Sequence, residues 1–196
     1  PADKLCLALD FPEKSIALDW VRRTHHQVGV YKIGLELFCA EGASMIEAVR
    51  NAGAARIFLD LKLHDIPRTV GRAVGRLRAL GVDYLTIHTS GGSEMMRCAA
   101  DGAAGELALL GVTVLTSMDG ASLVAIGADS NPTALVEKRG RLALENGIDG
   151  LVCSAMEARH LRESLGECLL VTPGIRCAGS SDDDQKRIMT PQAAIK

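Results

Sequence analysis

Residues 57–65 read Ile-Phe-Leu-Asp-Leu-Lys-Leu-His-Asp, and they are the most informative part of the chain. Successive side chains of a strand point to opposite faces, so Asp60 and Lys62 are expected side by side on one face. A surface strand would scatter its charges along its length, whereas here they close an otherwise apolar strand. Pro67 follows shortly afterwards and is expected to begin a helix. Charged residues at the carboxyl end of a strand, followed by a helix, are typical of a barrel enzyme.

Strand-like runs alternate with helix-like runs along the whole chain. The expected strands cover residues 5–9, 28–33, 56–62, 84–88, 109–115, 150–153 and 168–171. The expected helices cover residues 12–24, 43–52, 67–80, 133–146 and 155–165, with two more beginning near Gly92 and Pro191. Such a series of βα units predicts a parallel sheet with right-handed crossovers. An open doubly wound sheet would give a similar string, but the strand count favours an α/β fold of the (β/α)8 TIM-barrel class.

No eighth strand is visible before the sequence ends at Lys196. We therefore expect residues 1–196 to form a single (β/α)-barrel domain that lacks its C-terminal βα unit. A barrel without that strand would have two unpaired edges. Two explanations stay open at this point: an incomplete record of an intact enzyme, which we favour, or a truncated and inactive chain.

The composition argues against several classes of protein. The 196 residues carry a net charge of −2 and only 3% aromatic side chains, so nucleic acid is not an expected partner. The longest apolar stretch, near residues 107–115, is far shorter than the roughly 20 residues of a membrane helix, so no membrane association is expected. The cysteines show no CxxC pair, which is typical of the reducing cytosol. We expect a soluble cytoplasmic protein.

Charged or polar residues recur at the ends of the expected strands. They are Asp10, Lys32, Asp60, Lys62, Asp65, His88, Thr116 and the segment Thr-Pro-Gly-Ile-Arg at residues 172–176. In a barrel the carboxyl ends of all strands converge on one face, so residues distant in sequence become neighbours. The candidate catalytic groups are Lys32, Asp60, Lys62 and Asp65. Positive and negative charges would alternate in this array, so that all of its members can stay ionised.

Each of these residues also has a purely structural explanation. Asp60 and Lys62 could form a plain ion pair, and Asp65 could cap the helix that follows. Lys32 could extend its ammonium group to solvent. His64 faces away from the charged pair by strand alternation and is expected to have a packing or supporting role. Charged groups gathered together at strand ends nevertheless favour a functional site over separate structural roles.

Residues 59–69, Leu-Asp-Leu-Lys-Leu-His-Asp-Ile-Pro-Arg-Thr, resemble the active-site signature of the orotidine 5′-monophosphate decarboxylase family. Other segments resemble the family in its order, namely residues 8–10, 31–34, 114–118, 171–176 and 187–191. The resemblance covers nearly the whole chain. The combination of Asp-x-Lys-x-x-Asp with Thr-Pro-Gly-Ile-Arg is highly specific, whereas related sugar-phosphate decarboxylases and synthases share the first motif alone.

The resemblance implies a reaction and the roles of the catalytic residues. The family converts orotidine 5′-monophosphate to uridine 5′-monophosphate in de novo pyrimidine biosynthesis, so no cofactor and no metal are expected. Lys62 would protonate C6 of the pyrimidine as carbon dioxide leaves, and Asp60 would face the substrate carboxylate. Lys32 would hold Asp60 and a ribose hydroxyl, and Asp10 would bind the ribose as well.

The resemblance also implies the remaining substrate contacts. Thr116 falls where the family contacts the pyrimidine ring. Arg176 and Gln185 would bind the phosphate from a loop at about residues 174–187 that closes over the ligand. The family's eighth strand, which normally completes the phosphate site with a Gly-Arg pair, is absent from this sequence.

A shared active site is the last implication of the resemblance. Asp65 and Thr69 would reach into the active site of a second subunit, so the working unit would be a homodimer.

Two other functions stay open. A metal-dependent sugar-phosphate decarboxylase of the same barrel family would be expected to carry a carboxylate at the end of the second strand, where this chain has Lys32. A barrel that binds a nucleotide without turnover is the non-enzymatic alternative.

Overall fold

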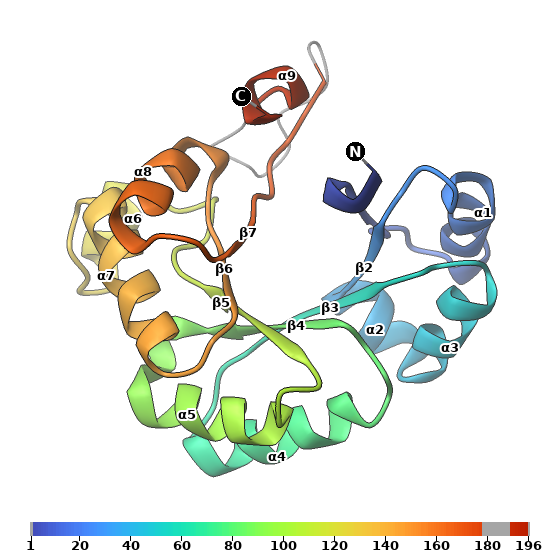
Figure 1. Ribbon diagram of the computed structural model, residues 1–196, viewed down its shortest axis with the longest axis horizontal. Coiled ribbons are helices and arrows are strands. Elements are labelled where there is room, and N and C mark those ends of the chain that lie inside the picture. Colours follow the sequence, from blue (N-terminus) through green and yellow to red (C-terminus); the bar gives the residue numbers. More distant parts are fainter. Residues whose placement is uncertain (1, 178–188, 196) are drawn as a thin grey trace.

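The computed structural model describes residues 2–177 and 189–195, so the predicted phosphate ligand Gln185 lies outside the described residues. The described chain contains one sheet of seven parallel strands in the order β1 to β7. The strands are β1 (Cys6–Ala8), β2 (Val30–Gly34), β3 (Ile57–Leu63), β4 (Tyr84–His88), β5 (Ala108–Val112), β6 (Gly150–Val152) and β7 (Leu169–Val171). The sheet curls as a barrel wall does (Figure 1). The predicted α/β barrel architecture is therefore confirmed.

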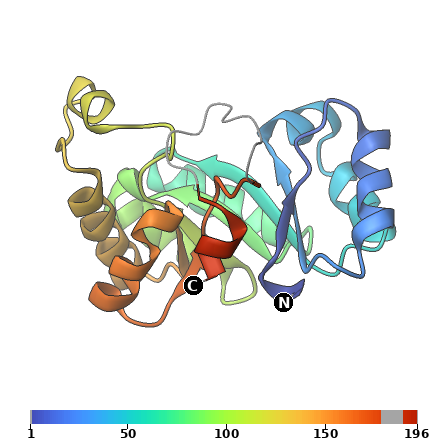
Figure 2. The ribbon, with the colours of Figure 1, turned by 90° about the horizontal axis from the view of Figure 1, so that it is seen from above.

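Helices cover the convex side of this sheet (Figures 1 and 2). They are α1 (Lys14–Thr24), α2 (Leu35–Glu41), α3 (Ser44–Asn51), α4 (Pro67–Arg78), α5 (Gly92–Ala103), α6 (Gly120–Ala125), α7 (Pro132–Glu145) and α8 (Ala155–Leu165), with α9 (Pro191–Ile195) near the C-terminus. Two short 3₁₀ helices are η1 (Ala2–Lys4) and η2 (Thr89–Gly91). Within the described ranges no helix is both long and apolar enough to cross a bilayer.

Two short helices, α2 and α6, were not predicted from the sequence. Helix α2 begins directly after Gly34, which leaves no loop to mark its start. Helix α6 begins after Asp119, whose carboxylate accepts a hydrogen bond from the Ser122 amide. Helices this short show too few apolar repeats for a periodic signal.

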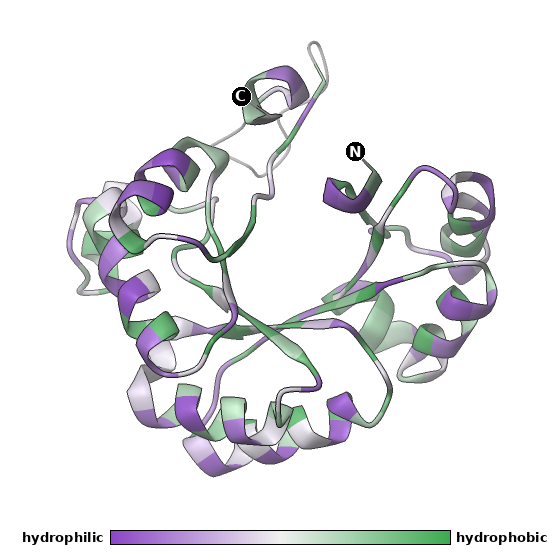
Figure 3. Cartoon of the chain, viewed as in Figure 1, coloured by the Kyte–Doolittle hydropathy of each residue, from purple (hydrophilic) through white to green (hydrophobic). Residues whose placement is uncertain are grey.

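The two faces of the sheet pack into separate apolar clusters. The outer cluster, between strands and helices, includes Ile33, Leu59 and Leu85. The inner cluster, inside the curl, contains Val30, Phe58 and Leu110, with Tyr84, Val152 and Val171 packed against them. Apolar colouring accordingly follows the strands, while the helices are mixed (Figure 3). Strand alternation therefore separates an outer layer from a filled barrel interior.

Helices α4 and α5 pack closely through glycine. A Cβ atom added at Gly71 of α4 would lie only 2.7 Å from the carbonyl oxygen of Cys98 on α5. At Gly75, one turn later, the nearest atom would be 3.9 Å away. Because α4 begins soon after β3 ends, the packing of α4 on α5 helps to fix the segment between β3 and α4.

We predict opposite effects for two alanine substitutions in α4. Gly71→Ala should lower the free energy of unfolding by about 1–2 kcal/mol, since overpacking against a backbone carbonyl outweighs the better helix propensity. Gly75→Ala should leave it unchanged or raise it by up to about 1 kcal/mol. Urea denaturation of both variants tests this, and equal stability of the two would show that the close approach is not limiting.

Candidate active site

The candidate site begins where the inner apolar layer ends. Neighbouring residues of that layer are Val30 on β2, Phe58 on β3 and Tyr84 on β4. Two positions further toward the carboxyl ends, the same face carries Lys32, Asp60 and Thr86. Side chains at i and i+2 share a face of a strand, so on each of these strands a polar residue follows an apolar one inside the curl.

Asp60 lies at the centre of this polar layer. The residue is only 9% exposed. One carboxylate oxygen, Oδ2, lies 2.9 Å from the ammonium nitrogen of Lys62 and 3.6 Å from that of Lys32. The other, Oδ1, accepts a 2.9 Å hydrogen bond from the hydroxyl of Thr86. An unpaired charge buried to this degree would be costly, and here the carboxylate has two cations and a hydroxyl donor.

Lys32 joins β1 to β3 through its ammonium group. Besides facing Asp60, it donates a 2.9 Å hydrogen bond to the Oδ1 atom of Asp10, whose side chain is largely exposed. Gly34 leaves the space for this pair, since a Cβ atom there would lie 3.0 Å from Asp10 Oδ1 and 3.2 Å from Lys32 Nζ. Sequence reasoning did not assign Gly34 a role, because only the folded register shows what a side chain there would meet.

The predicted contact of Asp60 with Lys62 is present, but the strand that carries it is not regular. Lys62 has a left-handed backbone with φ 51°. The pairing of β3 with β4 also shifts register between Leu59 and Leu63. A residue other than glycine in this conformation costs roughly 1–3 kcal/mol, and such strain gathers at functional sites. The expectation of a uniformly alternating strand through Lys62 was therefore wrong.

Thr86 is a member of the site that sequence reasoning missed. Its side chain is fully buried, and its hydroxyl contacts both Asp60 and the main chain of Lys62. The available signal was its position, because it shares a strand face with His88, two residues later. A single threonine in an apolar strand is otherwise unremarkable.

Asp65 and Thr69 lie apart from this array within one chain. Both residues are exposed. Asp65 accepts a 2.6 Å hydrogen bond from the amide of Ile66 and makes no ion pair within the described residues. The N-cap of α4 is Ile66, with no side-chain capping bond, so the suggestion that Asp65 caps this helix was wrong. Of the predicted four-charge array, one chain brings together Lys32, Asp60 and Lys62.

A pair of histidines borders the charged array. The rings of His64 and His88 lie 5.4 Å apart between centroids, at the ends of β3 and β4. Burial lowers the pKa of His88, and the nearby His64 and Lys62 lower it further. His88 is therefore neutral at pH 7 and adds no further positive charge beside Lys62. His64 is exposed and contacts His88 rather than the carboxylate of Asp60.

The remaining predicted substrate contacts lie at other strand ends. Thr116 is buried in a turn after β5, which ends at Val112, earlier than expected. Arg176 follows an isolated bridge between Ile175 and Met189, and its guanidinium donates a 3.1 Å hydrogen bond to the carbonyl of Ile175. Both residues therefore follow the carboxyl ends of strands, as predicted.

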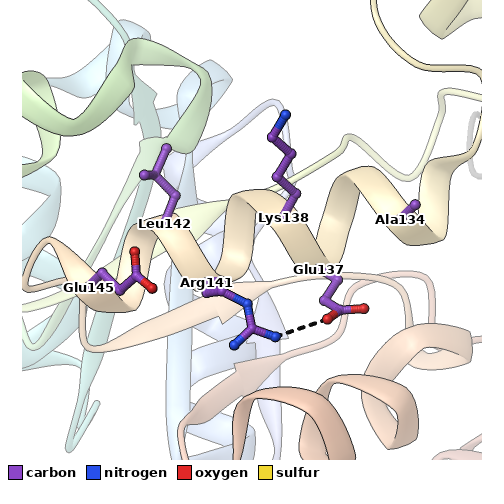
Figure 4. Close-up of a pocket in the computed structure, with 6 residues that line it drawn as sticks. All are labelled: Ala134, Glu137, Lys138, Arg141, Leu142 and Glu145. Atoms are coloured by element: carbon purple, nitrogen blue, oxygen red, sulfur yellow. Dashed lines mark hydrogen bonds and ion pairs between the residues drawn. The ribbon is translucent and has the colours of Figure 1, made fainter.

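A surface pocket on α7 lies apart from the strand ends. It is lined by Ala134, Glu137, Lys138, Arg141, Leu142 and Glu145 (Figure 4). Glu137 lies 3.0 Å from Arg141 and 2.8 Å from His160 of α8, and hydrogen bonds to these two residues lower its pKa. The pocket is a solvated helix surface with paired charges. In the part of the chain that the structure describes, no three His, Cys, Asp or Glu side chains gather as a metal-ligand set.

Comparison with known proteins identifies the family of the chain. The profile of the Orotidine 5'-phosphate decarboxylase / HUMPS family matches residues 3–196. The chain is 44% identical over 197 residues to an orotidine 5'-phosphate decarboxylase of Anaeromyxobacter sp. (strain K), covering 100% of this chain and 86% of the relative. It is 47% identical over 195 residues to one of Rhodopseudomonas palustris (strain BisA53), covering 98% and 82%.

A solved structure shows the same arrangement. The crystal structure of orotidine 5'-phosphate decarboxylase from Lactobacillus acidophilus superposes with a TM-score of 0.80 at 34% identity, covering 97% of this chain and 84% of that one. Both the sequence match over the full described fold and the shared architecture point to one family. The chain therefore belongs to the Orotidine 5'-phosphate decarboxylase / HUMPS family.

Proposed function

We propose that this chain decarboxylates orotidine 5′-monophosphate to uridine 5′-monophosphate, a reaction of pyrimidine biosynthesis, without a cofactor. The observation that carries the proposal is the Asp60 carboxylate between the ammonium groups of Lys62 and Lys32, at 2.9 and 3.6 Å. The relatives named as orotidine 5'-phosphate decarboxylases support this substrate. A cytoplasmic location is expected for such an enzyme.

Lys62 carries the central chemical step in this proposal. The bond from C6 to the carboxylate breaks, carbon dioxide leaves, and the electron pair stays on C6. With no cofactor to accept that pair, the protein must stabilise the carbanion electrostatically and then protonate it. A fixed ammonium group does both, because it places positive charge beside C6 and supplies the proton.

Asp60 contributes in two ways. It holds the Lys62 ammonium in place through their 2.9 Å contact. It would also lie against the substrate carboxylate, and two carboxylates about 4 Å apart repel by about 4 kcal/mol at an effective dielectric of about 20. If the departure of carbon dioxide relieved that repulsion fully, Asp60 would accelerate the reaction by at most about 10³-fold. The proposal therefore rests on carbanion stabilisation by Lys62 and not on this repulsion.

The substrate-binding roles follow the placement of the remaining groups. Asp10 and Lys32, joined at 2.9 Å, offer a carboxylate and an ammonium to the ribose hydroxyls. Thr116 is assigned to the pyrimidine ring. Arg176, with Gln185, is assigned to the phosphate, for which a planar guanidinium is well suited. Phosphate binding far from C6 supplies energy that can be used at the reacting carbon.

We also propose that two copies of the chain share their active sites. Asp65 and Thr69 are exposed at the start of α4 and take no part in the charged array of their own chain. Ile66 between them is 67% exposed, so the segment offers an apolar side chain as well as polar ones to a partner. A second subunit that covers this segment would receive Asp65 beside its own Lys62.

The metal-dependent sugar-phosphate decarboxylase is the alternative within the same family. It would be expected to carry a carboxylate at the position of Lys32, in the middle of β2. The ammonium of Lys32 lies 3.6 Å from Asp60, where it would repel a divalent cation. The charge at this one position favours orotidine 5′-monophosphate as the substrate.

Replacing Lys62 with alanine should abolish turnover while the fold is retained. Loss of a general acid alone typically lowers a rate by about 10²–10⁴-fold, and the carbanion would lose its stabilising charge as well. Turnover is followed by the ultraviolet absorbance change of the substrate, and circular dichroism checks the fold. Lys138→Ala on α7 is the matched control and should keep full activity. A Lys62→Ala rate above about 1% of wild type would remove this residue as proton donor.

Mixtures of two inactive variants test the shared site. Asp65→Ala and Lys62→Ala homodimers should each be inactive. After subunit exchange, the hybrid dimer would have one site that keeps both groups, so part of the wild-type activity should return. If exchange is shown by mass spectrometry of the mixed dimers and no activity returns, the sites are not shared in this way.

A further inference from the structure

One buried hydroxyl connects the two halves of the charged pair on β3. Thr86 lies in the middle of β4, and its side chain has no exposed surface. Its Oγ1 atom is 2.9 Å from the backbone nitrogen of Lys62 and 2.9 Å from Oδ1 of Asp60. An amide N–H can only donate and a carboxylate can only accept, whereas a hydroxyl does both. The hydroxyl of Thr86 therefore accepts from Lys62 and donates to Asp60.

The backbone of β3 explains why this contact is needed. Leu59 pairs with Leu85 and Leu63 pairs with Ile87, so four residue steps on β3 lie against two on β4. Lys62 falls inside this irregular stretch, in its left-handed conformation. A partly buried amide that leaves a regular strand pairing needs another acceptor. The side chain of Thr86 supplies it and holds the strained residue that presents the ammonium group.

We propose that Thr86 is a positioning residue of this site, fixing Asp60 and Lys62 relative to each other through one hydroxyl. Its assignment to catalysis rests on the proposed function. The oxygen fixes the backbone from which the Lys62 side chain starts, and it fixes the carboxylate that the Lys62 ammonium contacts. The backbone of Lys62 and the carboxylate that binds its ammonium group are thus both held by Oγ1 of Thr86.

A nearby threonine provides the matched control. Thr89 is 1% exposed, and its hydroxyl donates a 3.0 Å hydrogen bond to the carbonyl of Val112. Valine has a similar shape to threonine, so replacing either residue with valine removes one buried hydroxyl and changes the packing little. Only the change at Thr86 leaves Asp60 and the Lys62 amide without that partner.

The test compares kcat and KM for orotidine 5′-monophosphate in Thr86→Val, Thr86→Ser and Thr89→Val proteins. Thr86→Val should lower kcat by about 10²-fold, the cost of an ångström-scale misplacement, with KM changed by less than about threefold because the ribose and phosphate contacts remain. Thr86→Ser keeps the hydroxyl and should stay within about fivefold of wild-type kcat. Equal kcat in Thr86→Val and Thr89→Val would overturn the proposal.

A second variant covers the case in which Thr86→Val does not fold. Thr86→Cys keeps the size of the side chain but offers only a weak donor and acceptor. Its kcat should fall between wild type and the Lys62→Ala level, clearly below that of Thr86→Ser. A cysteine variant as active as the serine variant would contradict the role of the hydroxyl.

Hydrogen exchange of the Lys62 amide separates this proposal from the proposed function. In ¹⁵N-labelled protein, this amide should be protected in wild type and Thr86→Ser, and should exchange faster in the folded Thr86→Cys protein, with the Thr89→Val protein unchanged. This readout needs no substrate, so it holds even if wild type shows no decarboxylation and the proposed function fails. A Lys62 amide equally protected in the Cys and Ser variants would refute the contact itself.

Discussion

The carboxylate of Asp60, buried between two ammonium groups, is the interaction on which the rest of the site depends. Lys62 and Lys32 approach the same oxygen, at 2.9 and 3.6 Å, and come from adjacent strands. Breaking a buried charge pair by removing one partner commonly costs about 3–5 kcal/mol, because the remaining charge is left uncompensated. The carboxylate thus holds each lysine in place, and the two lysines, with the Thr86 hydroxyl, compensate its buried charge.

The barrel produces this arrangement by stacking two layers inside the curl of the sheet. The apolar layer that contains Val30, Phe58 and Tyr84 closes the lower interior. The polar layer follows at the next position on the same strand faces, toward the carboxyl ends. Val30 and Phe58 are buried beneath the charges, and Asp60 itself is only 9% exposed, so interactions of its carboxylate are stronger than they would be at an open surface. The fold therefore supplies both the convergence and the environment of the charges.

Much of this could be predicted from the sequence, because strand periodicity is a direct physical signal. The period-2 pattern around Asp60 predicted the strand and the contact of Asp60 with Lys62, and the alternation of elements predicted the parallel sheet. Sequence motifs gave the family, which the comparisons confirm.

Other features depended on register and backbone conformation, which the sequence pattern does not encode. The left-handed Lys62 and the shift between β3 and β4 appear only when the two strands are paired. Thr86 became a site residue for the same reason, since its two partners lie on the neighbouring strand. Gly34 belongs to the site because the absence of a Cβ atom there leaves room for the contact of Lys32 with Asp10.

The central claim is that this charge array decarboxylates orotidine 5′-monophosphate with no metal ion. The most direct test is the ultraviolet absorbance of the substrate after addition of purified protein that has been treated with a chelator. We expect rapid conversion to uridine 5′-monophosphate at a rate that added magnesium does not change. Absence of conversion in folded protein, or conversion that appears only after magnesium is restored, would contradict it.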